Sequence, residues 1–320
     1  MAQHDKVKEK EPRHSGRIRQ IPLYLGKLFR LFFYMDDWKV IPMAALVAGL
    51  VSLVSASKIF RSMEGTLAGA LALTCLCIWN GFFNSIQSVC RERDVVKREH
   101  RNGMHISSYI IAHMIYQAFI CAVQVVVTIF VCDMGGMAFP TEGFITSSFY
   151  VDLGITLFLI TYASDMLSLL ISCFAKNTTS AMTIMPFMLI FELLFSDAMF
   201  KLSEALEPFT NLSFAKWGIR CIATLADYNS QPMTSVWSQL VKLKGVELNG
   251  TKPVELFVDY IQKNGLKDQF NLMVGQHTQN AEYARNLMNI FNCWLVLILF
   301  AFICAVFAII ILEFIDKDKR

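Results

Sequence analysis

Long apolar runs without a formal charge are the feature that most constrains how this chain can fold. One run begins at Val40 and carries no charged residue for 18 positions, through Ser57. A helix of that length rises about 27 Å, enough for a tilted crossing of a hydrocarbon core about 30 Å thick. Comparable runs place six predicted spans at about 40–57, 66–90, 104–132, 144–174, 181–195 and 287–312. Because a bilayer interior offers backbone groups no water, we predict an all-α membrane protein with six transmembrane helices.

The composition agrees with a membrane protein and excludes several other classes. Of the 320 residues, 55% are hydrophobic, and the mean hydropathy is +0.45. A net charge of only +3 gives no support for a nucleic acid partner. Nearly all of the nine cysteines fall inside apolar runs, where Cys behaves as a small buried apolar residue. Cys75 and Cys77 have no His or carboxylate beside them, so no metal site is predicted.

The segments that precede the first span differ from one another in character. Residues 1–17 are polar and basic, and we predict a disordered tail there. Over 18–35, apolar residues recur at helical spacing, with Arg19, Lys27 and Arg30 between them. That pattern predicts an amphipathic helix lying in the interface plane.

The remaining divisions follow from the spans themselves. Residues 36–197 hold the first five predicted helices, with a charged loop at 91–103 between the second and third. Residues 198–286 form a large predicted loop before the last helix, which with its tail occupies 287–320. Within that large loop, the apolar stretch from Phe209 to Ile222 is too short to span and contains Lys216 and Arg220. We therefore expect a re-entrant or interfacial helix, followed by a small subdomain of short helices.

The short loops set the predicted orientation. Lys and Arg gather in the N-terminal tail, in the 91–103 loop, at Lys176 and at the C-terminus, which are four segments on one predicted side. Because cytoplasmic loops carry an excess of Lys and Arg, this distribution places both termini in the cytoplasm and 198–286 outside it. The sequence thus predicts a multi-pass protein of the cell membrane.

The stretch from Arg91 to Tyr109 is the most charged segment outside the N-terminal tail. Its charged residues alternate in sign: five basic (Arg91, Arg93, Lys97, Arg98, Arg101) and three acidic (Glu92, Asp94, Glu99). Such a segment cannot lie in hydrocarbon, so we expect it at the cytoplasmic membrane surface.

The order of these residues resembles a known family. Glu92-Arg93, a gap, Arg98-Glu99, a spacer containing Gly, and Ser107-Ser108-Tyr109 resemble the first intracellular loop of the G-subfamily of ATP-binding cassette transporters. The segment Leu212-Ser-Phe-Ala-Lys-Trp217 is similar to the one that follows the fifth span in that subfamily. The resemblance covers about residues 18–320. It implies that the 91–103 loop carries a short coupling helix that contacts the ATPase through Glu92, Arg93, Lys97, Arg98 and Glu99.

The resemblance also implies partners and a direction of transport. The sequence contains no Gly-x-x-x-x-Gly-Lys-Ser/Thr, so ATP and Mg²⁺ are expected on a separate cassette ATPase subunit and no cofactor on this chain. By family analogy the chain is a stand-alone permease subunit that pairs with a second permease as a homodimer or heterodimer. Membrane lipid surrounds it, and export of a lipid-like or hydrophobic substrate is the expected activity.

Two sets of polar residues within the spans are candidates for the substrate path. Asn80, Asn84, Gln87 and Arg91 recur at i, i+4, i+7 and i+11, which places them on one helix face. That face either lines the translocation cavity or forms a hydrogen-bonded seam between helices. Glu192, like Asp165, must face protein rather than lipid, as a point on the substrate path or as a brace between spans.

Two other function classes stay open at this stage. One is a polytopic membrane enzyme with its site on the 198–286 loop, where His277 lies. The other is a channel or secondary transporter, although the two halves of the sequence show no internal repeat of the kind common in those proteins. Neither His-Glu-x-x-His nor Gly-x-Ser-x-Gly occurs in the sequence.

Overall fold

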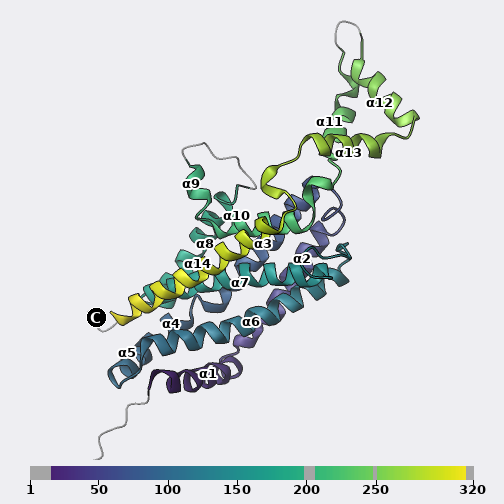
Figure 1. Cartoon of the computed structure of the whole chain (residues 1–320). Helices are drawn as coiled ribbons and strands as arrows, with labels where there is room; N and C mark the ends of the chain where they lie inside the picture. The colour runs from purple at the N-terminus through teal and green to yellow at the C-terminus, as the bar shows by residue number, and fades with distance from the viewer. Residues whose placement is uncertain (1–15, 198–205, 248–250, 315–320) are drawn as a thin grey trace, which may run out of the picture.

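The protein is a bundle of long helices with a small helical subdomain at one end (Figure 1). The computed structural model describes residues 16–197, 206–247 and 251–314. Five helical segments are long and apolar enough to cross a membrane: Asp37–Ser55, Met63–Arg91, Ile106–Met134, Phe149–Phe174 and Leu287–Glu313. This confirms an all-helical protein with several membrane-crossing helices. The fifth predicted span is α8 (Thr178–Leu194), an apolar helix of 17 residues that is shorter than the others.

The long segments correspond to α2 (Val40–Ser55), α3 (Met63–Ser85), α6 (Ile106–Met134), α7 (Phe149–Phe174) and α14 (Leu287–Glu313). Short 3-10 turns join or extend the helices at Asp37–Lys39, Tyr228–Ser230, Leu243–Gly245 and Ala281–Tyr283. Helix α7 is the central one. Within its most apolar 18-residue stretch, 78% is buried inside the bundle, against 17% for the segment that contains α2.

Helices α3 and α7 approach closely because small residues line their contact. A Cβ added to Gly81 would lie 2.4 Å from the backbone oxygen of Thr161, so only Gly fits there. The Ser164 hydroxyl donates to the backbone oxygen of Ile78 at 2.7 Å, and that of Ser168 donates to Gly81 at 3.2 Å. Small residues and short hydroxyl bonds are the usual means of packing helices in a membrane, where lipid competes equally for apolar contact.

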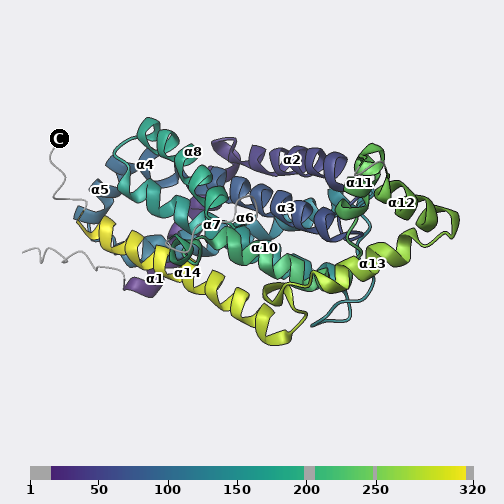
Figure 2. The same cartoon turned by 90° about the horizontal axis from the view of Figure 1, so that it is seen from above.

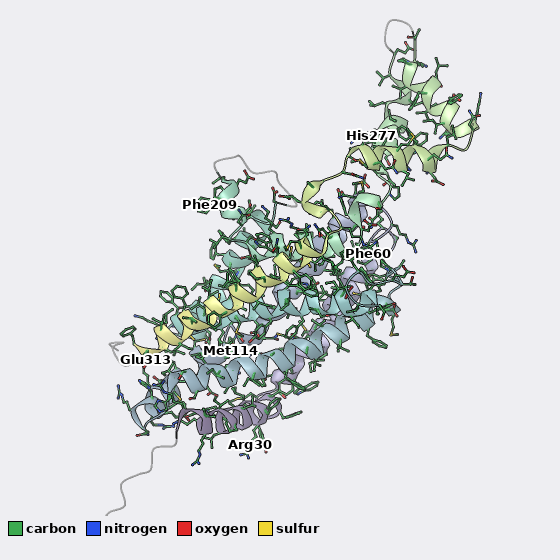
Figure 3. All side chains as sticks on the ribbon, viewed as in Figure 1. Arg30, Phe60, Met114, Phe209, His277 and Glu313 are labelled. Atoms are coloured by element: carbon green, nitrogen blue, oxygen red, sulfur yellow. The ribbon has the colours of Figure 1, made fainter. Side chains whose placement is uncertain are left out.

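One end of the bundle, called the inner end below, carries α1 (Arg17–Tyr34), α4 (Ser88–Arg91) and α5 (Arg93–Arg101). Helix α1 buries Gln20, Tyr24, Leu28 and Phe32, a four-residue spacing that gives one buried face. That face packs against α6, and the helix predicted over 18–35 is therefore present. Helix α14 ends at this same end, as Arg30 and Glu313 show in Figure 3.

The opposite end, called the outer end, carries a separate subdomain. It consists of α11 (Ser235–Lys242), α12 (Pro253–Lys263) and α13 (Lys267–His277) around the small core of Trp237, Val258 and Ile261. Figure 2 shows these helices beyond the ends of α3 and α10.

The apolar stretch that was too short to span forms α9 (Glu207–Thr210) and α10 (Phe214–Leu225). Helix α10 packs against α3, α7 and α14, and ten of its twelve residues are buried. Helix α10 is therefore enclosed by other helices of the bundle.

Two predicted spans differ from the observed helices at one end. The second span, predicted over 66–90, turns at Ile86–Gln87, so that α4 is a separate helix after α3. The fourth, predicted from 144, begins only at Phe149. The Asp152 carboxylate accepts hydrogen bonds from the backbone nitrogens of residues 144–146 at 2.8 to 3.0 Å. Those bonds hold the preceding segment in a loop across the helix start.

Candidate functional site

Helix α5 forms the tip of the inner end and has two distinct faces. Val96 is 0% exposed and anchors the inward face to the bundle. Asp94, Arg98 and Arg101 are exposed at i, i+4 and i+7, which places them together on the opposite face. The outward face is therefore charged and accessible to another protein.

Helix α1 holds α5 in place through one lysine. Lys27 Nζ lies 3.2 Å from Glu92 Oε2 and 3.4 Å from Glu99 Oε1, so one ammonium bridges the two ends of α5. The side-chain amide of Gln20 makes two hydrogen bonds to the segment that follows α5 in the chain. It donates to the backbone oxygen of Gly103 at 3.0 Å and accepts from the backbone nitrogen of His105 at 2.9 Å. A movement of α5 would therefore be transmitted to α1.

Tyr24 supports the same contact from the buried face of α1. Burial, and then the neighbouring Glu99 carboxylate, raises the pKa of Tyr24 to about 12, so the phenol stays protonated. Its ring meets that of Tyr109 edge-on, with centroids 5.8 Å apart. Tyr109 lies in the first turn of α6, which links α1, α5 and α6 in one cluster.

A second set of bonds joins α4 and α5 to the central helix. Arg93 Nη1 donates to the backbone oxygens of Cys173 and Ala175 at 2.9 and 3.0 Å. A cation is favourable there because the last carbonyls of α7 have no partner within the helix. The Ser172 hydroxyl accepts from the backbone nitrogens of Val89 and Cys90, both at 3.1 Å. Helix α7 is thus coupled directly to the inner end.

The five predicted coupling residues fall into those that are bonded within this chain and those that are not buried by such contacts. Glu92, Arg93 and Glu99 contact other parts of this chain, whereas Arg98 is exposed and Lys97 is half-buried. The sequence did not identify Lys27 or Ser172, the partners that hold this segment. A basic residue between apolar positions of α1 was visible, but nothing in the sequence paired it with acids more than 60 residues away.

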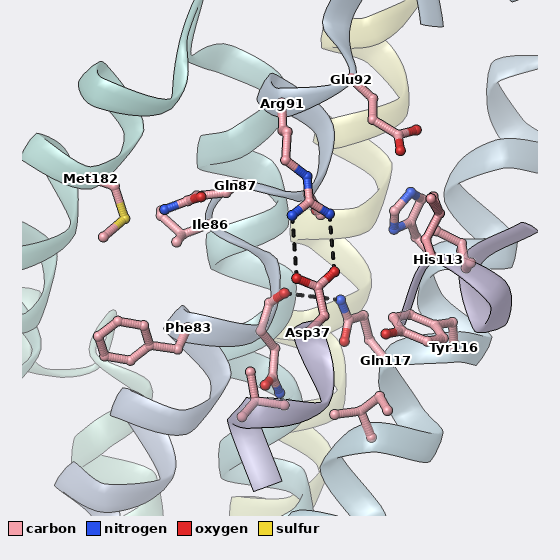
Figure 4. A pocket seen from close by; sticks show the side chains of 16 residues that line it. Asp37, Phe83, Ile86, Gln87, Arg91, Glu92, His113, Tyr116, Gln117 and Met182 are labelled. Carbon is pink, nitrogen blue, oxygen red and sulfur yellow. Dashed lines mark hydrogen bonds and ion pairs between the residues drawn. The ribbon is translucent and has the colours of Figure 1, made fainter. Parts of the chain in front are cut away.

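A cavity of about 180 Å³ lies beside this cluster, between α1, the start of α2, α3, α4, α6 and α8. Arg91 and Asp37 close one side as a two-bond ion pair, with nitrogen–oxygen distances of 3.0 and 3.3 Å (Figure 4). In Figure 4, His113, Tyr116 and Gln117 of α6 lie on one side, and Phe83 and Met182 lie on the other. The cavity therefore has a polar wall that faces an apolar one.

The predicted polar face of the second span is only partly in this cavity. Asn84, Gln87 and Arg91 line it, but Asn80 is buried elsewhere and does not. Asn84 also exchanges two hydrogen bonds with Gln124 of α6, at 2.8 and 2.9 Å. Asn84 therefore has both of the positions considered for this polar face, since it belongs to a seam between helices and to the cavity wall.

His113 and Gln117 line the cavity and were not identified from the sequence. They are 1% and 2% exposed. Among the described residues, neither ring nitrogen of His113 has a hydrogen-bond partner, and the same is true of Gln117 Oε1. The Gln117 amide nitrogen donates to the backbone oxygen of Asn84 at 3.4 Å. The sequence signal was a His and a Gln four residues apart in an otherwise apolar run.

Glu192 lies in the last turn of α8 and does not line the cavity. It is 1% exposed, and its Oε2 accepts from the Ser213 hydroxyl at 2.8 Å and from the backbone nitrogen of Ala215 at 3.2 Å. Ser213 is the N-cap of α10, so a carboxylate of α8 meets the positive end of another helix. Asp165 is likewise buried, and the Cys121 thiol donates to it at 3.4 Å. The position of Glu192 fits a brace that holds α10 on α8.

Comparison with known proteins gives two matches. The profile of the ABC-2 type transporter membrane family matches residues 29–224, from within α1 to near the end of α10. The chain is also 27% identical over 236 residues to the ABC transporter ATP-binding/permease protein Rv1747 of Mycobacterium tuberculosis. That alignment covers 68% of this chain and 26% of the relative, so the chain spans about a quarter of the relative's length.

Proposed function

The chain belongs to the ABC-2 type transporter family, and we propose that it is a permease subunit driven by a separate cassette ATPase that contacts α5. The observation that carries the proposal is the two-faced α5 helix. Its inner face is bonded to α1 and α7, and its outer face presents exposed charge. ABC-2 permeases generally work with an ATPase subunit, so family membership supports this function over the membrane enzyme and the secondary transporter that the sequence left open.

The contacts suggest how ATP-driven movement would reach the membrane. Closure of the ATPase subunits displaces α5, and the displacement passes along two routes. One route runs from Glu92 and Glu99 through Lys27 to α1, and the other from Arg93 to the end of α7. Because α7 packs against α3, α6 and α14, its motion changes the arrangement of most of the bundle. ATP and Mg²⁺ are bound by the ATPase subunit in this proposal.

The topology we propose has six spans, with α8 as the fifth. At 17 residues α8 rises about 25 Å, slightly less than the hydrocarbon core, and thinning of the bilayer beside it would accommodate the difference. An even number of spans places both termini on the cytoplasmic side with α1 and α5, and places α11–α13 outside the cell membrane. The net basic 91–103 segment supports this orientation.

The assembly and substrate class follow from the family resemblance and the apolar surface of the bundle. We propose two permease subunits, identical or similar, that export a lipid-like or hydrophobic substrate. The path includes the cavity residues Asn84 and Gln87. Asn80 and Glu192 are weaker path candidates, because one lies outside the cavity lining and the other is bonded to the start of α10.

A charge reversal on α5 tests the proposal. Co-purification from native membranes identifies the ATPase, and the two proteins are then reconstituted together. Arg98→Glu changes only the exposed face of α5, so the chain should insert normally but retain about tenfold less ATPase, a loss of about 1.4 kcal/mol in association. Lys242→Glu makes the same charge change on the exposed surface of α11 and should have no effect. Equal ATPase retention and transport in both variants would contradict the proposal.

A further inference from the structure

The inner cavity contains polar groups that the protein itself does not use. His113 and Gln117 are almost completely buried, yet in the described part of the chain both ring nitrogens and Gln117 Oε1 lack partners. Leaving a buried polar group without a hydrogen bond costs about 1–3 kcal/mol. Two such side chains one helical turn apart face the same cavity (Figure 4). This arrangement is expected of a binding site and not of a packed interior.

Each charged side chain of the cavity lining already has a partner of opposite sign. Arg91 and Asp37 pair with each other, and Glu92 pairs with Lys27, which lies outside the lining. An anionic headgroup would meet the carboxylates of Asp37 and Glu92, and a cationic headgroup would meet the Arg91 guanidinium. A neutral ligand is therefore favoured.

The unpartnered groups specify what that ligand must offer. Gln117 Oε1 can only accept a hydrogen bond, so it requires a donor. A neutral imidazole at His113 provides one donor and one acceptor. A hydroxyl group both donates and accepts, and one hydroxyl between these two side chains would donate to Gln117 Oε1 and accept from the N–H of His113.

The opposite wall is apolar and indicates the rest of the ligand. Phe83 and Met182 lie on it, opposite His113 and Gln117 (Figure 4), and Leu28, Leu31 and Ile120 add apolar surface elsewhere in the lining. Gln87 and Met182 are shared with a shallow groove at Thr178, Thr179 and Thr183, at the start of α8. His113 lies seven residues into α6, about 10 Å from its inner end, a depth that matches the headgroup boundary of the inner leaflet.

We propose that this cavity binds the hydroxyl-bearing headgroup of a neutral amphiphilic lipid, with the hydroxyl between His113 and Gln117 and the acyl chains toward α8. The inference that the lipid is cargo rests on the proposed permease function. Binding itself does not, because it needs only this chain.

The test uses the full chain without ATPase in phosphatidylcholine nanodiscs, with radiolabelled dioleoylglycerol as the probe. Three competitors separate the possibilities: unlabelled dioleoylglycerol, its O-acetylated form and dioleoyl phosphatidic acid. Gln117→Leu and His113→Phe remove the proposed contacts at similar volume. Thr128→Val removes a buried hydroxyl farther along α6, outside the cavity lining, and is the matched control.

We expect dioleoylglycerol to compete at least about tenfold better than its acetylated form, the value of one hydrogen bond. Gln117→Leu and His113→Phe should each weaken probe binding about tenfold, and Thr128→Val should not. Gln117→Leu removes an unpartnered acceptor together with the long 3.4 Å hydrogen bond to Asn84, so its unfolding temperature without the probe should be close to that of the wild type.

Equal competition by the acetylated lipid, or probe binding unaffected by both cavity variants, would overturn the proposal and indicate a cavity filled by water. Preference for phosphatidic acid would overturn it in favour of an anion site. Failure here leaves the ATPase contact of α5 untouched. Conversely, loss of the Arg98→Glu effect would remove the cargo role but not the lipid site.

Discussion

Asp152 and Glu192, two buried acids outside the cavity, differ from the buried polar groups of the inner cavity in how completely they are bonded. Asp152 accepts three backbone N–H groups, and Glu192 accepts one N–H and one hydroxyl. His113 and Gln117 are equally buried, yet they retain unused donors and acceptors among the described residues. Within one membrane domain, bonded acids indicate support of the fold, and unpartnered polar groups that line a cavity indicate space for a ligand.

The largest effect is expected at Asp152, since its carboxylate holds the loop before α7. Asp152→Ala leaves three backbone N–H groups without their acceptor and should cost about 3 kcal/mol or more of folding free energy. Asp152→Asn keeps one oxygen and should cost less. Thermal unfolding of the purified variants in detergent measures both. Full stability of the alanine variant would remove the distinction between the bonded acids and the polar groups of the cavity.

Glu192 should show a smaller effect of the same kind. Glu192→Ala removes the acceptor at the start of α10 and should cost about 2 kcal/mol, whereas Glu192→Gln keeps an oxygen there and should cost about half as much. Unfolding measurements are paired with transport assays. An altered substrate range in Glu192→Gln at unchanged stability would instead favour the path role that the sequence suggested.

Lys27 should affect coupling more than stability. The side chains of Lys27 and Glu99 are 31% and 30% exposed and that of Glu92 is 14% exposed, so Lys27→Met should cost about 1 kcal/mol of folding free energy. Loss of the bridge between α1 and α5 should nevertheless reduce transport per ATP hydrolysed by several-fold. Lys39→Met removes a fully surface-exposed pair with Asp36 near the same end and is the control. Equal coupling ratios in the two variants would show that α1 does not transmit the movement of α5.

Features that depend on local sequence were predictable. Apolar length gave the long spans, since Val40 to Ser57 and Leu287 to Leu312 carry no charge in their interiors. Helical periodicity gave α1, and alternating charge gave the position of α5. Each of these properties lies within one segment, where spacing alone indicates which face is buried.

Features that depend on long-range contacts were not predictable. Arg93 contacts carbonyls at Cys173 and Ala175, about 80 residues away, and charge pattern alone does not name a partner. The turn at Ile86–Gln87 contains neither Gly nor Pro. The predicted polar face of the second span therefore continues across it as if the helix were unbroken. In the sequence, His113 is a single histidine in an apolar run. Only the folded structure shows that it lines a cavity. The cavity exists only through the packing of six helices.

The most direct test of ATP-driven movement is the labelling rate of a cysteine at Gln87, which lines both the cavity and the groove by α8. The protein is reconstituted with its ATPase, and a membrane-impermeant thiol reagent is applied with and without ATP. The wild type, whose native cysteines are mostly buried, supplies the background. The account predicts that ATP changes the labelling rate of Gln87→Cys several-fold and that Arg98→Glu abolishes the change. An unchanged rate while ATP is being hydrolysed would contradict the coupling of this cavity to an ATPase.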